Sequence, residues 1–227
     1  MKYEYLLKIN SSRVDLVSHD VVLDAGLPGR ASFTINSIDT PSGVVLFSFS
    51  VNNGKQHSQF YGYIERSIKV SDGVWSIFCR EKSNALEMRA PIALRNKTLK
   101  DILSEVKILT GIGFAIPSSD YSIKSIPYCV NTGGGFHLMQ SLGSMFEIED
   151  YLWQQRRDGL VFVGSWSDGH WPDNPVTIPS ALLDKQSSNQ TAEILAIPGL
   201  RPNYLLNGNR LKSVRMIESK MVVSWKK

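Results

Sequence analysis

The four histidines are the first residues to consider for chemistry, because a general base or a metal site most often uses one. They are His19, His57, His137 and His170. None of them lies in a nucleophile-elbow or HExxH pattern. His19 is followed by Asp20, but neighbours in a strand point to opposite faces, so this aspartate is badly placed to orient the imidazole. We interpret the pair as a surface dipeptide.

Acidic residues gather in two places. Glu147, Glu149 and Asp150 form the densest cluster, and their spacing before a strand divides them between its faces, unlike glycosidase carboxylates, which face each other across a cleft. The segment SDGHWPDN, which begins at Ser167, holds carboxylates and an imidazole that suit a metal or a sugar. A turn-rich polar loop anchored by its tryptophan is the simpler interpretation. We therefore expect no metal site and no catalytic acid in either place.

Glycine and cysteine patterns point the same way. The glycine run 133–135 precedes a helical pattern, so its amides could cradle a phosphate, but it lacks the Lys-Ser/Thr of a P-loop and the rest of a dinucleotide fingerprint. Cys79 and Cys129 belong to no CxxC or Cys/His cluster, and we interpret them as buried, reduced thiols. The sequence therefore predicts a protein that is not an enzyme and that binds no cofactor.

The overall composition is that of an ordinary globular protein, with 42% hydrophobic and 20% charged residues and a net charge of +4 over 227 residues. This charge is mild and no block of Lys and Arg occurs, which disfavours a nucleic-acid-binding surface. No apolar run approaches the roughly 18–20 residues that span a bilayer. The opening MKYEYLLKIN lacks a signal-peptide cleavage pattern. We expect neither membrane insertion nor general secretory export.

Alternating apolar residues predict strands through the first 93 residues. They run over residues 3–9, 31–35 and 45–51, with turn signals such as Asn52-Asn53-Gly54 between the runs. The segments QFYGYIERSIKV and VWSIFCR predict a hairpin joined at Asp72-Gly73. Open strand edges invite aggregation, so such a meander must close or be covered. We predict a mainly β fold with a closed or partly closed antiparallel barrel and an α+β insertion.

The helix of that insertion has marked ends. In TLKDILSEVKILTGIGFAI, Thr98 and Asp101 predict a capping box, and Gly111 stands where a left-handed terminal residue is favoured. Helical spacing places one apolar face toward the core, formed by Leu99, Ile102, Leu103, Val106 and Leu109. The short run that begins at Gly113 suits a strand.

The remaining patterns define three segments. Residues 1–93 form the first part of the barrel, and residues 94–166 form an inserted α+β unit with a second helical stripe from Phe136 and a hairpin at Asp158-Gly159. Residues 167–227 begin with an aperiodic stretch up to residue 189, which predicts a loop. They end in strands around Asn207-Gly208 that complete or extend the barrel.

In their order, four segments resemble the tail-hub, or late control protein D, family of bacteriophages, which is similar to the base of the VgrG spike of type VI secretion. They are FYGYIERSIKVSDGVWSIFCRE, TLKDILSEVKILTGIGFAI, FHLMQSLGSMFEIEDYLWQQRRDGLVFVG and PGLRPNYLLNGNRLKSVRMI. The PGLRPN motif at Pro198 resembles the turn that opens the family's last barrel hairpin. Well-known members are longer and carry two barrels per chain, whereas 227 residues leave room for one full barrel and at most a reduced second one.

The resemblance implies a structural virion component without catalysis. Its expected role is that of a baseplate hub at the distal end of the tail. DNA passes through its bore without specific binding. The expected assembly is a homotrimer that joins the tail tube or distal tail protein to a central spike or fibre. Such a protein is made in the bacterial host cytoplasm and resides in the virion tail.

We expect the oligomer interface to include Val222, Val223, Trp225, Leu99 and Ile102. The first three lie in the last strand and the other two in the helix that follows Thr98. Strand edges that are open in a monomer can pair across a heterologous interface, which closes into a ring.

Three other functions remain open. One is a carbohydrate- or receptor-binding β module of a tail tip, motivated by aromatic residues that stack on sugars, namely Tyr61, Tyr63, Trp153, Trp166 and Trp171. Another is a cell-wall hydrolase, since some hub proteins carry such domains, and the third is the binding of single-stranded nucleic acid on the barrel.

Overall fold

The computed structural model describes residues 1–179, 184–187 and 190–225. The chain divides into two compact units. The first unit consists of Met1–Glu81 and Asp173–Lys227, and the second unit, Lys82–Pro172, is inserted between these two parts. The sequence prediction set the corresponding boundaries at 93/94 and 166/167. Among the described residues, no helix is long and apolar enough to cross a membrane. The prediction of a mainly β chain is confirmed.

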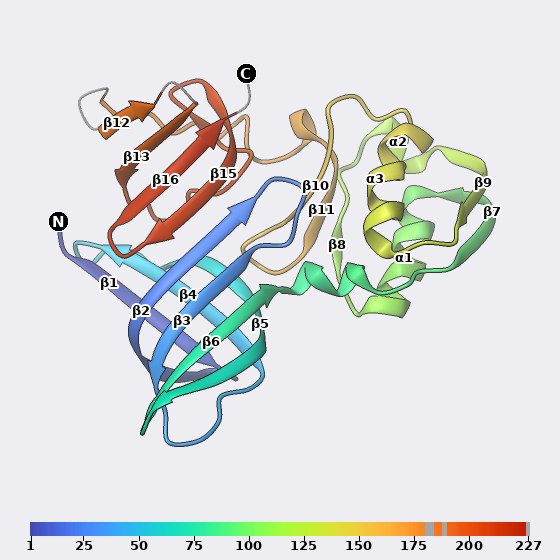
Figure 1. Cartoon of the computed structure of the whole chain (residues 1–227). Coiled ribbons are helices and arrows are strands. Elements are labelled where there is room, and N and C mark those ends of the chain that lie inside the picture. The colour runs from blue at the N-terminus through green and yellow to red at the C-terminus, as the bar shows by residue number, and fades with distance from the viewer. Residues whose placement is uncertain (180–183, 188–189, 226–227) are drawn as a thin grey trace. The chain divides into compact units, whose positions relative to one another are not determined.

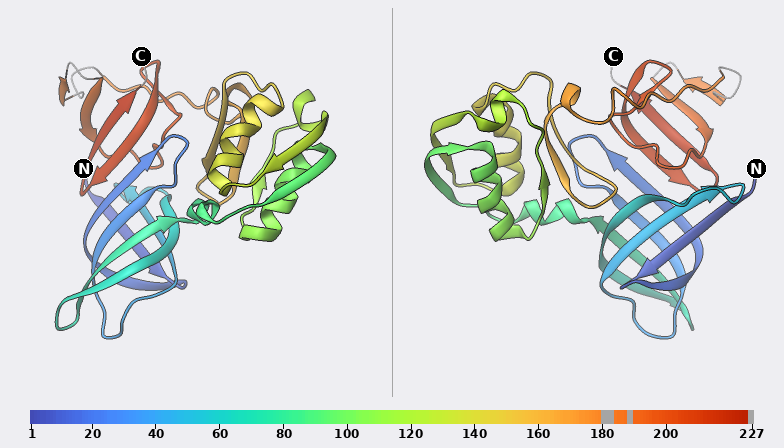
Figure 2. Two further views of the ribbon diagram at one scale, coloured as in Figure 1. Left: turned by 45° about the vertical axis from the view of Figure 1, so that its right-hand side comes forward. Right: turned by 180° about the vertical axis from the view of Figure 1, so that it is seen from behind.

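Strands β1 to β6 of the first unit curl around a common interior (Figures 1 and 2). They pair in the order β1-β4-β5-β6-β3-β2, and β2 pairs again with β1. The predicted hairpin at Asp72-Gly73 is confirmed between β5 and β6. Large apolar side chains fill the interior, including Leu7, Phe33, Phe47, Phe60 and Ile77. The strand bounds are β1 Tyr3–Ile9, β2 Ser12–Asp24, β3 Arg30–Asn36, β4 Val44–Val51, β5 His57–Ser71 and β6 Val74–Glu81.

The C-terminal strands extend the same sheet from β2. Ser213 to Ile217 of β15 pair with Asp24 to Asp20 of β2, and the sheet continues through β16 and β13 to β12. The predicted turn at Asn207-Gly208 is confirmed, and both residues have positive φ, 48° and 81°. The bounds are β12 Asp184–Ser187, β13 Thr191–Leu195, β14 Leu205–Leu206, β15 Asn209–Ile217 and β16 Lys220–Trp225.

The loop predicted over residues 167–189 is wrong in part. Asp184–Ser187 forms β12, and the polar sequence DKQS carries no apolar alternation that would predict a strand. A short 3-10 helix, η2, covers Trp166–Asp168. Residues 180–183 and 188–189 of this prediction lie outside the described part of the chain.

The second unit contains two small sheets with helices packed against them. One sheet has the order β10-β11-β8 and the other pairs β7 with β9. The predicted helices, the strand after Gly113 and the Asp158-Gly159 hairpin are confirmed, whereas β7, β9 and α2 were not predicted. The bounds are η1 Lys82–Glu87, β7 Ile92–Thr98, α1 Leu99–Thr110, β8 Phe114–Ala115, α2 Asp120–Ile123, β9 Ser125–Asn131, α3 Gly135–Met145, β10 Tyr151–Gln155 and β11 Val161–Ser165.

Helix α1 has the predicted ends. The Thr98 hydroxyl accepts a hydrogen bond from the Asp101 amide, and the Asp101 carboxylate accepts one from the Thr98 amide at 3.0 Å. Gly111 ends the helix with a φ of 72°. The predicted apolar face is buried except for Leu109, which is 44% exposed. That part of the prediction is wrong because the buried stripe ends at Val106, one turn before the helix does.

Candidate functional site: an opening between β1 and β2

Strand β2 is not paired along its whole length. One of its edges pairs with β3 from Asp15 to Val22. The other edge pairs with β1 up to Val14 and with β15 from Asp20 onward. Asp15–His19 therefore have no strand partner on that edge, which leaves an opening in the ring.

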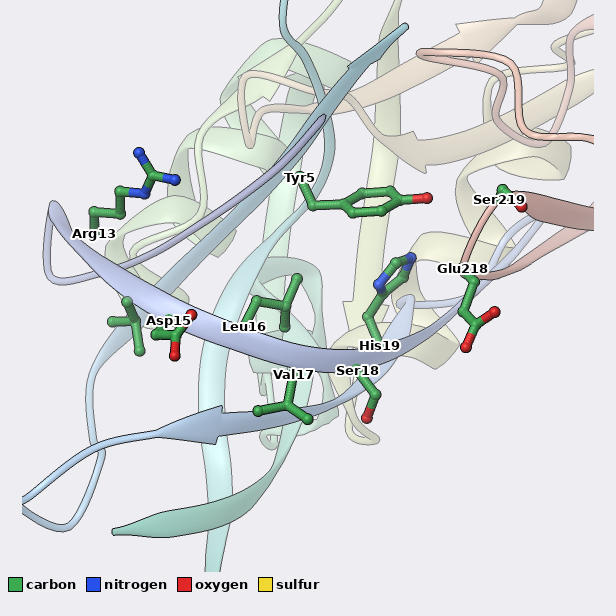
Figure 3. A pocket seen from close by; sticks show the side chains of 10 residues that line it. Tyr5, Arg13, Asp15, Leu16, Val17, Ser18, His19, Glu218 and Ser219 are labelled. Carbon is green, nitrogen blue, oxygen red and sulfur yellow. The ribbon is translucent and has the colours of Figure 1, made fainter. Parts of the chain in front are cut away.

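The opening has a second wall on β1. Tyr3–Leu6 pair with β4 on one edge, whereas the pairing of β1 with β2 covers only Leu7–Ile9. The two strands thus diverge from the Leu7–Val14 pair, and the turn Glu218-Ser219 between β15 and β16 borders the far end. An open pocket of about 780 Å³ lies here (Figure 3). It is lined by β1, the Arg13–His19 segment of β2 and this turn.

His19 is the central polar side chain of this pocket. It is only 6% exposed, and its ring lies 4.7 Å from the rings of both Tyr5 and Phe47. Its Nε2 atom has no hydrogen-bond partner among the described residues. Burial lowers the pKa of His19 from 6.5 to about 4, against the opposing effects of the Glu218 backbone and the Asp20 charge. The imidazole is therefore neutral at neutral pH and can make one further hydrogen bond.

The interpretation of His19 and Asp20 as a surface dipeptide is wrong for the histidine. Asp20 lies near the surface, where its carboxylate pairs with the Arg215 guanidinium at 2.7 and 3.0 Å. His19 points to the interior because the pairing of β2 with β3 shifts register between Leu16 and Ser18. Such a bulge moves every later side chain to the other face of the strand.

Charged side chains stand at both ends of the opening. Arg13 lies at the end where β1 and β2 join, and Glu218 lies at the far end (Figure 3). Neither forms an ion pair among the described residues. Burial, together with the nearby Tyr3 and Glu218, raises the pKa of Tyr5 to about 12, so its hydroxyl stays protonated. The opening offers an unpaired strand edge, one neutral imidazole, the cationic side chain of Arg13 and the carboxylates of Asp15 and Glu218.

A buried ion pair, which sequence reasoning missed, joins the C-terminal part of the first unit to its N-terminal part. The Arg201 guanidinium donates to the Glu81 carboxylate at 2.5 Å and to the Gln59 carbonyl at 2.6 Å, and the Gly29 amide donates to Glu81 at 2.8 Å. The Gln59 side-chain amide donates to the Leu200 carbonyl at 2.9 Å. The signal was the PGLRPN motif, which predicted a turn but not the role of its arginine.

The structure separates the residues predicted for the oligomer interface. Val222 and Val223 neighbour each other in β16, but Val222 is 42% exposed whereas Val223 is fully buried. Trp225 ends the same strand and is partly buried. Leu99 and Ile102 belong to the buried core of the second unit. Val222 is therefore the most accessible of the five, and the interface itself stays a prediction.

The other chemical candidates have structural explanations in the second unit. The Gly135 amide donates to the Met88 carbonyl, and a Cβ on Gly135 would lie 2.6 Å from the Leu86 carbonyl oxygen, so close packing on η1 explains this glycine. Trp171 of SDGHWPDN is buried and contacts Phe162 edge-on.

No group of acidic, histidine or cysteine side chains in the described part of the chain is arranged to hold a metal ion. Glu147 pairs with Lys124, which lowers the pKa of its carboxyl group. Cys79 and Cys129 are buried and free, as predicted.

Known proteins resemble this chain mainly in fold. The chain has a TM-score of 0.71 to the 43 kDa tail protein of prophage MuSo2 from Shewanella oneidensis, with 9% sequence identity. The match includes 100% of this chain and 98% of the prophage protein. This is a tail-protein fold. An E. coli component of the type VI secretion system, described as similar to T4 bacteriophage tail proteins, gives a TM-score of 0.63 and 10% identity over 97% of this chain and 77% of that one.

A sequence relative also comes from a phage. It is an uncharacterized 58.7 kDa protein of Haemophilus phage HP1, 27% identical over 217 residues. The match covers 95% of this chain but only 40% of that protein. No protein-family model matches the chain.

Proposed function

We propose that this protein is a structural component of a phage-type tail and serves as the hub at its distal end. The observation that carries the proposal is the likeness to a whole prophage tail protein, which extends over the full length of both chains. The phage origin of the sequence relative supports it. In this role the first unit is a barrel of tail-hub type, related to the base of a VgrG spike.

The proposed assembly is a homotrimeric ring. It joins the tail tube or distal tail protein on one side to the central spike or fibre on the other, and DNA passes through its bore without specific binding. The protein performs no catalysis and resides in the virion tail after synthesis in the host cytoplasm. Within the ring, Val222 of β16 contributes to the subunit interface, since it is the exposed member of the predicted set.

The decisive measurement is the molar mass in solution, by light scattering after size exclusion, over a concentration series. We expect a trimer for the wild type and a monomer for Val222→Asp, because a buried carboxylate at the interface is strongly unfavourable. The matched control is Val44→Asp, since Val44 has nearly the same exposure, 43% against 42%, but lies in β4. It should remain a trimer with an unchanged β-rich circular dichroism spectrum.

A wild-type monomer that also fails to form rings with purified tail-tube protein, observed by negative-stain electron microscopy, would refute the hub assignment. The sugar-binding alternative gains nothing from Trp153 and Trp171, because both are buried and present no free face.

A further inference from the structure

The opening between β1 and β2 has the properties of a strand-docking site. Between Val14 and Asp20 the edge of β2 carries no strand. At about 3.3 Å per residue, this gap is roughly 20 Å long, which matches an extended segment of six or seven residues. Exposed strand edges are the surfaces to which peptides add by β-augmentation, with main-chain hydrogen bonds providing affinity.

The floor of the opening restricts which side chains such a segment can direct inward. Tyr5 and His19 point toward one another beneath the opening (Figure 3), and their rings lie 4.7 Å apart. Inward side chains of a docked segment would meet these rings, so we expect small ones there. The Nε2 atom of His19 is itself buried and has no hydrogen-bond partner among the described residues, so a hydroxyl group that enters between the strands and reaches it is favoured, because a buried polar atom without a hydrogen bond is costly.

The outer face and the two ends add further requirements. Val17, at the bulge of β2, is 58% exposed and lines the pocket, so apolar outward side chains gain contact area. Arg13 and Asp15 line the pocket near one end and their charges offset each other, whereas Glu218 at the other end favours a basic residue at that terminus of the segment.

We propose that this opening binds an extended segment of a partner protein, which adds a strand to the Asp15–His19 edge and places a Ser or Thr hydroxyl against Nε2 of His19. The segment alternates small hydroxyl residues inward with apolar residues outward. A basic residue at the end near Glu218 fixes its direction along β2.

The test uses the whole 227-residue chain and two synthetic peptides, acetyl-Glu-Val-Ser-Val-Ser-Val-Lys-amide and the same sequence reversed, which represent the two strand directions. Fluorescence anisotropy of labelled peptides gives the affinity, and hydrogen–deuterium exchange locates the contact. We expect one peptide to bind with a dissociation constant below about 1 mM and to slow amide exchange at Asp15–His19. N-methylation of its three valines should abolish binding, because it removes main-chain donors.

Two histidine variants test the proposed hydrogen bond. His19→Phe keeps an aromatic ring but removes Nε2, and should weaken binding about fivefold, the usual effect of one neutral hydrogen bond. His170→Phe is the control, because His170 lies in the second unit, with its ring 4.6 Å from that of Trp171, and its replacement should leave the affinity unchanged. Circular dichroism verifies that both variants fold.

The proposal is overturned if neither peptide binds at 2 mM, or if a peptide binds without slowing exchange at Asp15–His19. Equal binding by the wild type and His19→Phe would overturn the role of His19. These results do not depend on oligomeric state, so they are distinguishable from a failure of the hub proposal.

Discussion

The buried ion pair between Arg201 and Glu81 should dominate the stability of the first unit. Arg201 is 4% exposed and Glu81 is fully buried, so removing one partner leaves the other as an unpaired charge in the interior. Such a loss costs about 3–5 kcal/mol of unfolding free energy. We therefore expect Arg201→Met and Glu81→Leu each to destabilise the first unit by about this amount.

The double variant provides the sharper test. With both charges removed, neither desolvation penalty remains, and apolar replacements of a buried pair are often neutral or stabilising. The double variant should thus cost no more than either single variant, a departure from additivity of at least about 3 kcal/mol. Lys69→Met is the control, because Lys69 pairs with Asp72 at the surface and should contribute about 0–1 kcal/mol.

The assay is urea unfolding, monitored by hydrogen exchange in peptides from β5 and β6. These peptides report the unfolding of the first unit separately from that of the second. Single-variant costs that add in the double variant to within about 0.5 kcal/mol would refute this reasoning, since they would show that the two side chains do not interact.

Three further predictions concern single sites. Burial lowers the pKa of His19 from 6.5 to about 4, so between these pH values the unfolded chain binds a proton that the folded chain does not. The free energy of unfolding should therefore fall by about 2 kcal/mol from pH 7 to pH 4.5. Urea unfolding at both pH values measures this loss, which should be absent in His19→Phe. Thr98→Ala should destabilise α1 by about 1 kcal/mol, measured as faster amide exchange in its first turn. Gly135→Ala should lower the melting temperature clearly more than Gly133→Ala, because its Cβ would lie 2.6 Å from a backbone oxygen of Leu86, against a nearest contact of 3.5 Å at Gly133.

Local signals predicted the elements whose ends have distinctive chemistry. Helix α1 was located from Thr98, Asp101 and Gly111, and the hairpins from Asp-Gly and Asn-Gly pairs that require positive φ. These features depend on residues close together in the chain, so a single sequence contains the information needed to find them.

The candidate site depends on contacts that the sequence does not display. Val14 and Leu16 point inward, and regular alternation would make Ser18 and Asp20 do the same. The bulge shifts the alternation by one residue, so His19 is buried instead. The unpaired edge of β2 arises from the separate courses of β1 and β15, which lie far apart in the sequence. The partner of Arg201 is 120 positions away, beyond the reach of any local pattern.

The inserted second unit has a consequence for the order of folding during synthesis. Glu81 is the last residue of the first unit before the insertion, and both Arg201 and β15 follow the insertion. Because domains fold as the ribosome releases them, the second unit can form while the first still lacks its ion pair and its partner along Asp20–Asp24. The first unit is completed after the second, so the full border of the opening exists only once Glu218 and Ser219 have been synthesised.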